Sequence, residues 1–335
     1  MPEIIKRKKA MSVNPLKASE PVGGSLATLG FNRAIPMLHG SQGCTAFAKV
    51  YFVRHFREPI PLQSTAMDQA SSVMGADENV IEGLKVIAEK SKPELITVLT
   101  TGLSETQGTD IKRCVREFRE RYPQFAEIAV VGVNTLDFTG SLETGYAATL
   151  AEIIDGLVPE AGAAGTKPGT RRRRVNVLAG SSLTPGDLDH LRDIIEGFGL
   201  RPVFVPDVSD SLDGHLVDED FSPVTFGGTG ISEVKALGDA AATLVIGASL
   251  KKGGGPAGKA DRRADRPIAS IICLDWRQPT HWCRPWQISA ATGCPTGWYA
   301  SGRIGRTRWS TPTSCWGFYG WPWRRTPICS MPLPT

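Results

Sequence analysis

The chain lacks the segments that membrane-spanning and secreted proteins need. No apolar run reaches the roughly 18 residues of a transmembrane helix, and no apolar signal-peptide core stands near the N-terminus. The formal net charge is only +4 at pH 7, whereas a dedicated nucleic-acid-binding protein would carry a clustered basic face. These absences predict a soluble, cytoplasmic protein that binds neither membranes nor nucleic acid.

Cysteine and tryptophan are scarce until late in the chain. Only Cys44 and Cys114 lie before residue 250, whereas the other five of the seven cysteines and all eight tryptophans follow residue 270. The spacings between these late cysteines match no zinc-binding pattern, so no zinc site is expected there. The late cysteines are Cys273, Cys283, Cys294, Cys315 and Cys329.

The character of the sequence changes near Lys251, after which helical and strand periodicity fades. Back-translation of this region in neighbouring reading frames can encode amphipathic helices and buried strands. We therefore hypothesise two frame changes, near Lys251 and near Ile268, which leave residues 251–335 as an aberrant tail where a third domain is missing or scrambled. Resequencing the gene across both points tests this hypothesis, and an intact single frame would contradict it.

Up to residue 250 the chain alternates apolar, β-rich runs with segments of helical apolar spacing, which predicts an α/β fold of Rossmann-like, mainly parallel sheets. We expect an N-terminal α/β domain over residues 1–165, a linker over 166–174 and a second Rossmann-like domain over 175–250. The expected strands are 94–100, 129–133, 175–178, 202–205 and 243–246. The expected helices are 110–121, 145–157, 232–242 and one that Thr184 caps and Gly199 ends.

The predicted linker ends in four arginines, Arg171 to Arg174. A solvated connection between domains is the simpler interpretation of such a charge run, and an anion-binding role is the alternative.

The segment HGSQGCTAFAKVYFVRHFREP, residues 39–59, is the most informative in the chain. Cys44 follows three small or turn-forming residues, Gly40, Ser41 and Gly43, and glycines let a backbone approach a bulky inorganic group. A thiolate is the preferred ligand of an iron-sulfur cluster, which normally takes four cysteines. Cys44 would then need ligands from elsewhere or from a partner, unless it is simply a small buried side chain. Cys114 has helical apolar neighbours and is expected in the core.

Three separated runs carry a family resemblance: SVNPLKASEPVGGSLATLGF, IPMLHGSQGCTAFAKV and VRHFREPIPLQSTAMDQ. In this order they resemble the family that comprises the subunits of molybdenum-iron nitrogenase and their cofactor-biosynthesis paralogues. The resemblance covers roughly residues 12–250 and implies Rossmann-like domains of the chelatase-like, nitrogenase type.

The catalytic β-subunits of that family supply three cysteines to an eight-iron cluster. Here Ser19 and Gly102 stand where the first and third would be, and only Cys44 remains. Glycine has no ligating side chain, and serine matches soft iron-sulfur chemistry poorly. The pattern resembles the NifN branch, in which one cysteine joins three from NifE to hold a [4Fe-4S] cluster. The resemblance therefore implies that Cys44 is a cofactor-binding and metal-ligating residue, with no catalytic residue in the chain.

The resemblance implies a scaffold subunit rather than an independent catalyst. Such a subunit pairs with NifE in a heterotetramer, receives an iron-sulfur precursor of the iron-molybdenum cofactor from NifB, matures it with NifH and passes it to the nitrogenase MoFe protein. Three alternatives stay open: a catalytic nitrogenase β-subunit, a cluster-free α/β binding protein with Cys44 buried, and an inactive frameshifted product.

Overall fold

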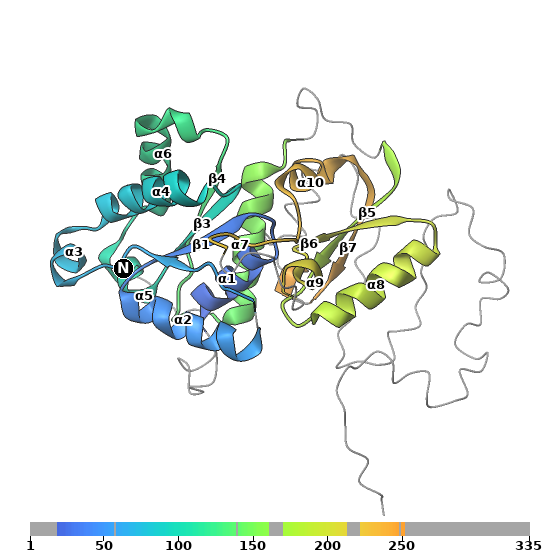
Figure 1. Ribbon diagram of the computed structural model, residues 1–335, viewed down its shortest axis with the longest axis horizontal. Coiled ribbons are helices and arrows are strands. Elements are labelled where there is room, and N and C mark those ends of the chain that lie inside the picture. The colour runs from blue at the N-terminus through green and yellow to red at the C-terminus, as the bar shows by residue number, and fades with distance from the viewer. Residues whose placement is uncertain are drawn as a thin grey trace, which may run out of the picture.

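The computed structural model describes residues 19–56, 58–138, 140–160, 170–212, 222–247 and 249–251. The predicted frameshifted tail lies outside the described residues apart from Lys251. The described chain forms two parallel sheets, each with helices packed on it (Figure 1). Among the described residues no helix is both long and apolar enough to span a membrane.

The first sheet has four strands in the order β2-β1-β3-β4, and the second has three in the order β6-β5-β7. The strands are β1 (Ala34–His39), β2 (Gln63–Ser64), β3 (Leu95–Thr100), β4 (Ala129–Val133), β5 (Arg171–Ala179), β6 (Arg201–Val205) and β7 (Ala240–Ile246). Every residue of β1, β3 and β4 is buried. Continuous apolar runs are typical of parallel strands covered on both faces, which explains why the sequence predicts β3 and β4. The sequence analysis did not predict β1, whose run contains Pro36 and ends in His39.

The first sheet is covered on both faces by helices. The helices before the second sheet are α1 (Glu20–Leu29), α2 (Gln42–His55), α3 (Gln69–Met74), α4 (Asp77–Ser91), α5 (Gly102–Gln107), α6 (Ile111–Arg121) and α7 (Leu142–Leu157). Helices α4 and α6 form one apolar cluster with Ile35 and Met37 of β1, and α1 and α7 join another that includes Leu38. The second sheet carries α8 (Pro185–Gly197), α9 (Val208–Ser211) and α10 (Ile231–Lys235).

The two sheets share one continuous apolar cluster, which contains residues of α1, α7 and all three strands of the second sheet. Hydrogen bonds also join them directly. The Tyr146 hydroxyl on α7 donates to the Ala179 carbonyl at the end of β5 over 2.9 Å. The Gly30 carbonyl, just after α1, accepts from the amides of Asp207 and Thr229 at 3.1 and 2.9 Å. The two sheets are therefore packed together through the end of α1 and through α7.

The structure corrects two predicted boundaries in the second unit. Strand β5 begins at Arg171, inside the predicted linker 166–174, because Arg171 pairs with Ala240 of β7 across an irregularity in the ladder. Helix α10 ends at Lys235 and β7 begins at Ala240, whereas the sequence predicts a helix up to residue 242. The predicted cap is confirmed, because the Thr184 hydroxyl accepts from the Asp187 amide at the start of α8.

Helices α1 and α7 cross at two glycines. A Cβ atom at Gly145 would lie 2.1 Å from the Glu20 carbonyl oxygen, and one at Gly23 would lie 1.9 Å from that of Leu142. Gly145→Ala is expected to lower the free energy of unfolding by about 2 kcal/mol. An overpacking cost of about 3 kcal/mol exceeds the gain of about 1 kcal/mol in helix propensity.

Denaturant unfolding checks this expectation against Gly156→Ala on the same helix. The nearest atom to a Cβ at Gly156 is Val131 Cγ2, at 3.9 Å, an ordinary contact. This control should therefore leave the protein as stable or slightly more stable. Equal unfolding curves for the two variants would contradict the close helix crossing.

Candidate cluster-ligand site

The site begins where β1 ends and the chain turns into α2. Gly40 forms that turn, and a Cβ atom there would lie only 2.4 Å from Thr101 Oγ1, so glycine alone fits without displacement. The Gly40 amide donates to Thr65 Oγ1 at 3.2 Å, and its carbonyl accepts from the Met67 amide at 2.9 Å. The Thr101 hydroxyl donates to the His39 carbonyl at 2.9 Å. Neighbouring segments therefore hold the turn in place from both sides.

Cys44 is the third residue of α2, and Ser41 occupies the N-cap position. The Cys44 Sγ atom lies 3.6 Å from Ser41 Oγ, and the cysteine is partly exposed. The first amides of a helix have no partner within the helix, and its positive end stabilises a thiolate or another anion. Near Gly43 a Cβ atom would meet nothing closer than Ser41 Oγ, at 3.8 Å. The donor atom, its electrostatic setting and the space beside it all fit a cluster ligand.

His39 closes β1 directly beneath this turn. Its side chain is fully buried, with Nδ1 2.9 Å from Thr65 Oγ1 and Nε2 3.4 Å from Thr109 Oγ1. Burial lowers the pKa of His39 to about 4, since desolvation disfavours the charged imidazolium. The imidazole is therefore neutral at physiological pH and links the ligand turn to the loops after β2 and α5.

Cys114 is fully buried on α6, as the sequence predicts. Its thiol donates to Asp77 Oδ1 at 3.5 Å. Burial, with the nearby carboxylate of Asp77, raises the pKa of Cys114 to about 12, so this residue stays a protonated thiol. Among the described residues no group of three or more histidine, cysteine or acidic side chains could hold a metal ion. The described part of the chain thus offers one cysteine suited to a cluster, Cys44.

Ser19 and Gly102 lie at helix starts. Ser19 is the N-cap of α1, and Gly102 is the first residue of α5. The Asp137 carboxylate accepts hydrogen bonds from the Ser19 hydroxyl and from the amides of Glu20 and Gly102. A single carboxylate therefore joins Ser19 and Gly102.

The sequence analysis did not identify Asp137. A signal was present, because Asp137 follows β4, and β1, β3 and β4 are adjacent parallel strands whose carboxyl ends meet at one edge. Loops at that edge are the usual place for ligands in such sheets.

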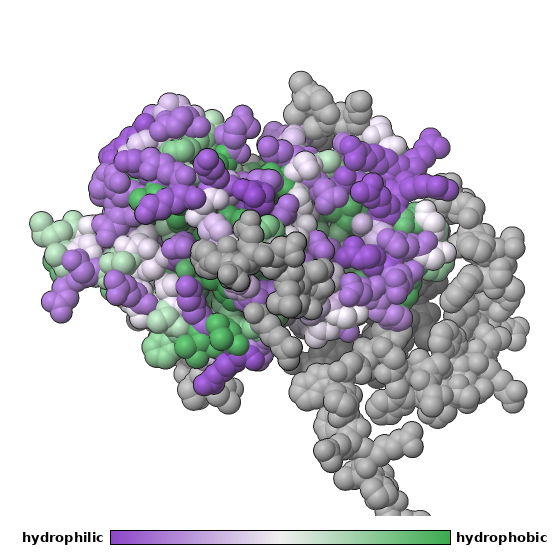
Figure 2. All heavy atoms as spheres, in the orientation of Figure 1, coloured by the Kyte–Doolittle hydropathy of each residue, from purple (hydrophilic) through white to green (hydrophobic). Residues whose placement is uncertain are grey.

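Helix α2 exposes large apolar side chains beside polar ones. Thr45, Ala48 and Phe52 are buried, whereas Phe47 is 72 % exposed and Val53 is 67 % exposed. Figure 2 shows apolar side chains gathered over α2. We call the large hydrophobic side chains that this helix exposes the α2 face; they are Phe47, Val50, Tyr51 and Val53. Lys49, Arg54 and His55 are exposed on the same helix.

Comparison with known proteins decides the family. The family model described as nitrogenase component 1 type oxidoreductase matches residues 19–257, a span that includes both sheets and all the site residues. The chain belongs to this family.

Two curated members of this nitrogenase component 1 family show the degree of similarity. The nitrogenase iron-molybdenum cofactor biosynthesis protein NifN of Klebsiella pneumoniae is 46 % identical over 252 residues, which are 75 % of this chain and 54 % of that protein. The NifN protein of Bradyrhizobium diazoefficiens is 44 % identical, over 73 % of this chain and 51 % of its own length. The chain therefore spans about half the length of the curated relatives it matches. The predicted resemblance is confirmed.

A solved nitrogenase structure has the same fold. The structure titled "Nitrogenase Cp1 at pH 6.5" superposes with a TM-score of 0.69 and 30 % sequence identity, over 81 % of this chain and 56 % of that one. This confirms the predicted α/β class and the nitrogenase-type parallel sheets. The family match ends at residue 257, close to the first frame change hypothesised from the sequence.

Proposed function

We propose that this chain is a scaffold subunit for biosynthesis of the nitrogenase iron-molybdenum cofactor. The proposal rests on a difference between three positions near the carboxyl edge of the first sheet: one has a thiol, and two do not. Cys44 offers a partly exposed thiol at a helix start, whereas Ser19 and Gly102 offer none and are joined by Asp137. The similarity to NifN proteins supports the same role.

Cys44 would be one ligand of a [4Fe-4S] cluster at a subunit interface. Such a cluster needs about four thiolates, and this chain has one at the right place, so a partner of the NifE type would supply three. When bound, the cluster supplies electron-transfer chemistry. This chain contributes the Cys44 thiol at a helix start and a buried, neutral His39 that fixes the ligand turn.

The α2 face is where NifE would cover this chain. Large apolar side chains that share one exposed side of a helix mark an interaction surface more often than a free one. Cys44 lies on the same helix, three residues before Phe47, so a subunit that covers the α2 face also reaches the thiol. Pairing through this face would give one NifE–NifN pair, and two such pairs would form the expected heterotetramer in the cytoplasm.

The chain would act with partners rather than as a separate enzyme. In this proposal the complex receives an iron-sulfur precursor from NifB, holds it during maturation with NifH, and passes the iron-molybdenum cofactor to the nitrogenase MoFe protein. The precursor is cargo here, and its direct ligands are expected chiefly on NifE.

Activation of cofactor-free nitrogenase tests the proposal. The full chain is coexpressed with NifE, and the purified complex is incubated with NifB, NifH, molybdate, homocitrate and cofactor-free MoFe protein. Acetylene reduction is expected only when this chain and NifE are both present. A complex that holds an eight-iron cluster and reduces acetylene without added MoFe protein would instead identify a catalytic β-subunit.

A frame-corrected chain is the matched control for this experiment. If residues 251–335 replace a third domain, the corrected chain should assemble with NifE and activate nitrogenase well. The uncorrected chain should do both poorly, because without that domain it lacks core area and interface area together. Equal activation by both would show that the tail is dispensable and would contradict the importance given to the third domain.

A further inference from the structure

An open groove of about 620 Å³ lies at the amino ends of β5 and β6. Five of the residues that line it are arginines, namely Arg171, Arg172, Arg173, Arg174 and Arg201. The parallel register pairs Arg174 directly with Arg201, which explains how residues from two strands meet in one groove. Figure 1 shows α10, which borders the groove, on the side of the molecule away from α2. This site is therefore separate from the cluster-ligand turn.

The positive charge of the groove is only partly compensated. Arg171 Nε lies 3.6 Å from Asp239 Oδ2, and Glu233 also lines the groove. Within the described ranges, no ion pair involves Arg172, Arg173 or Arg201, all three of which are exposed. Among the residues that the structure describes, five guanidinium groups therefore lie near the carboxylates of Glu233 and Asp239, and the excess charge is positive.

Arg174 places one of these charges inside the protein. It is only 7 % exposed, and its Nη2 donates to the Glu233 carbonyl oxygen at 2.8 Å. Its Nε atom is enclosed and has no hydrogen-bond partner among the described residues. Burial lowers the pKa of Arg174; the Glu233 and Asp239 carboxylates oppose this shift, and the neighbouring Arg171 and Arg201 add to it. A buried positive charge without a paired carboxylate is costly, and an anion in the groove would offset that cost.

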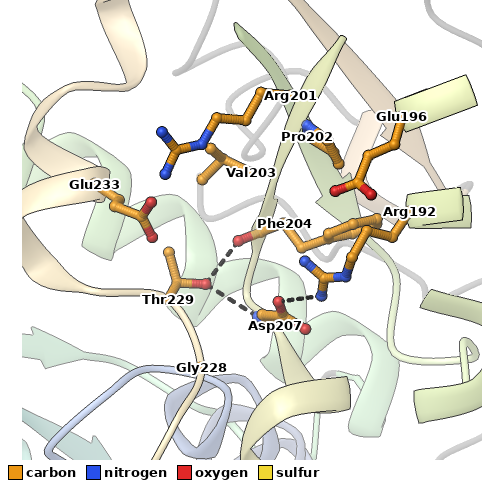
Figure 3. A pocket seen from close by; sticks show the side chains of 10 residues that line it. All are labelled: Arg192, Glu196, Arg201, Pro202, Val203, Phe204, Asp207, Gly228, Thr229 and Glu233. Atoms are coloured by element: carbon orange, nitrogen blue, oxygen red, sulfur yellow. Dashed lines mark hydrogen bonds and ion pairs between the residues drawn. The ribbon is translucent and has the colours of Figure 1, made fainter. Parts of the chain in front are cut away.

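The adjoining pocket contains an arginine, Arg192, whose charge is paired with a carboxylate (Figure 3). This pocket of about 190 Å³ shares Arg201 and Glu233 with the groove. Within it, Arg192 Nη2 lies 2.7 Å from Asp207 Oδ2 and 3.0 Å from Ser209 Oγ, and the guanidinium lies over the Phe204 ring at 4.9 Å. Arg192 therefore has a structural role that Arg172, Arg173 and Arg201 lack.

We propose that the arginine groove binds a small, multiply charged anion of the phosphate or carboxylate class. Guanidinium groups can bind the paired oxygens of both kinds of anion. The exposed Arg172, Arg173 and Arg201 can donate hydrogen bonds to the anion, while the buried Arg174 adds positive charge beside it. A groove of about 620 Å³ has the size of a small-molecule site. A nucleic-acid interface would need an extended basic face that buries about 1,000 Å² or more.

Isothermal titration calorimetry of the full chain tests this proposal, with inorganic pyrophosphate and citrate as separate probes at constant ionic strength. At least one probe is expected to bind, and the tighter one identifies the class of anion. Arg172→Gln/Arg173→Gln should weaken that binding about tenfold or more, because two charge-assisted contacts are lost. Arg201→Gln, on the other strand, should weaken it as well.

The matched control is Arg116→Gln/Lys90→Gln, which removes the same charge from exposed positions on α6 and α4. This variant should bind the probe as the wild type does. Circular dichroism melting curves confirm that each variant is folded. The proposal is overturned if neither probe binds, if both double variants lose affinity equally, or if a DNA duplex binds more tightly than either probe.

Discussion

Replacing Cys44 with alanine is expected to lower the iron content of the proposed complex with NifE by about tenfold or more. A cluster held by about four thiolates becomes labile when one is lost. The described part of the chain offers no replacement, because its second cysteine, Cys114, is buried against Asp77. Iron is measured by metal analysis of complexes purified in parallel under anaerobic conditions.

Cys114→Ala is the control for this result. The substitution leaves a small cavity in a fully buried position and should lower the free energy of unfolding by about 1 kcal/mol. The iron content of the complex should stay at the wild-type level. Loss of iron from the Cys114 variant, with iron retained in the Cys44 variant, would reassign the ligand.

The stability of the chain is expected to fall by up to about 3 kcal/mol between pH 6.5 and pH 4 because of His39 alone. The pKa of His39 is lowered by burial to about 4 in the folded chain, whereas an unfolded histidine titrates near 6.5. Between these values the unfolded state takes up a proton that the folded state does not, so stability decreases as the pH falls. Below about pH 4 both states are protonated and this contribution levels off.

His39→Asn isolates the contribution of this residue. The variant should be less stable than the wild type at pH 8, since the packing of the imidazole is lost. The difference between the two proteins should shrink as the pH falls toward 4, because only the wild type has an imidazole to protonate. Denaturant unfolding at several pH values provides the measurement. A constant difference across this range would show that His39 is not the buried, neutral group described here.

The α/β fold was predictable because its signals are local. Strands β3 and β4 are short, wholly buried runs in which apolar residues predominate, and α6 carries Ile111, Cys114, Val115 and Phe118 on one buried side. Parallel strands covered on both faces leave such runs in any single sequence. The boundaries of β5 and α10 depend instead on pairing between Arg171 and Ala240, far apart in the chain, which local patterns cannot show.

The candidate site was predictable only in part, because some of its contacts join residues far apart in the chain. The small residues before Cys44 indicate a close approach to that thiol, and the structure places it at a helix start. Asp137 accepts hydrogen bonds from Ser19 and Glu20, more than 100 positions earlier. Its place after β4 is a signal for the sheet edge but does not show these partners. Arg174 was predicted as part of a solvated linker, but pairing with β6 and cover from Glu233 bury it.

The iron count of the wild-type complex tests the central claim most directly. The full chain, or its frame-corrected version if assembly requires the third domain, is coexpressed with NifE in cells without NifB, so that no cofactor precursor adds iron. If Cys44 completes one interfacial cluster with three thiolates of the partner, the complex should contain about four iron atoms per pair of subunits. About eight iron atoms per pair, or none in a stable complex, would contradict this account.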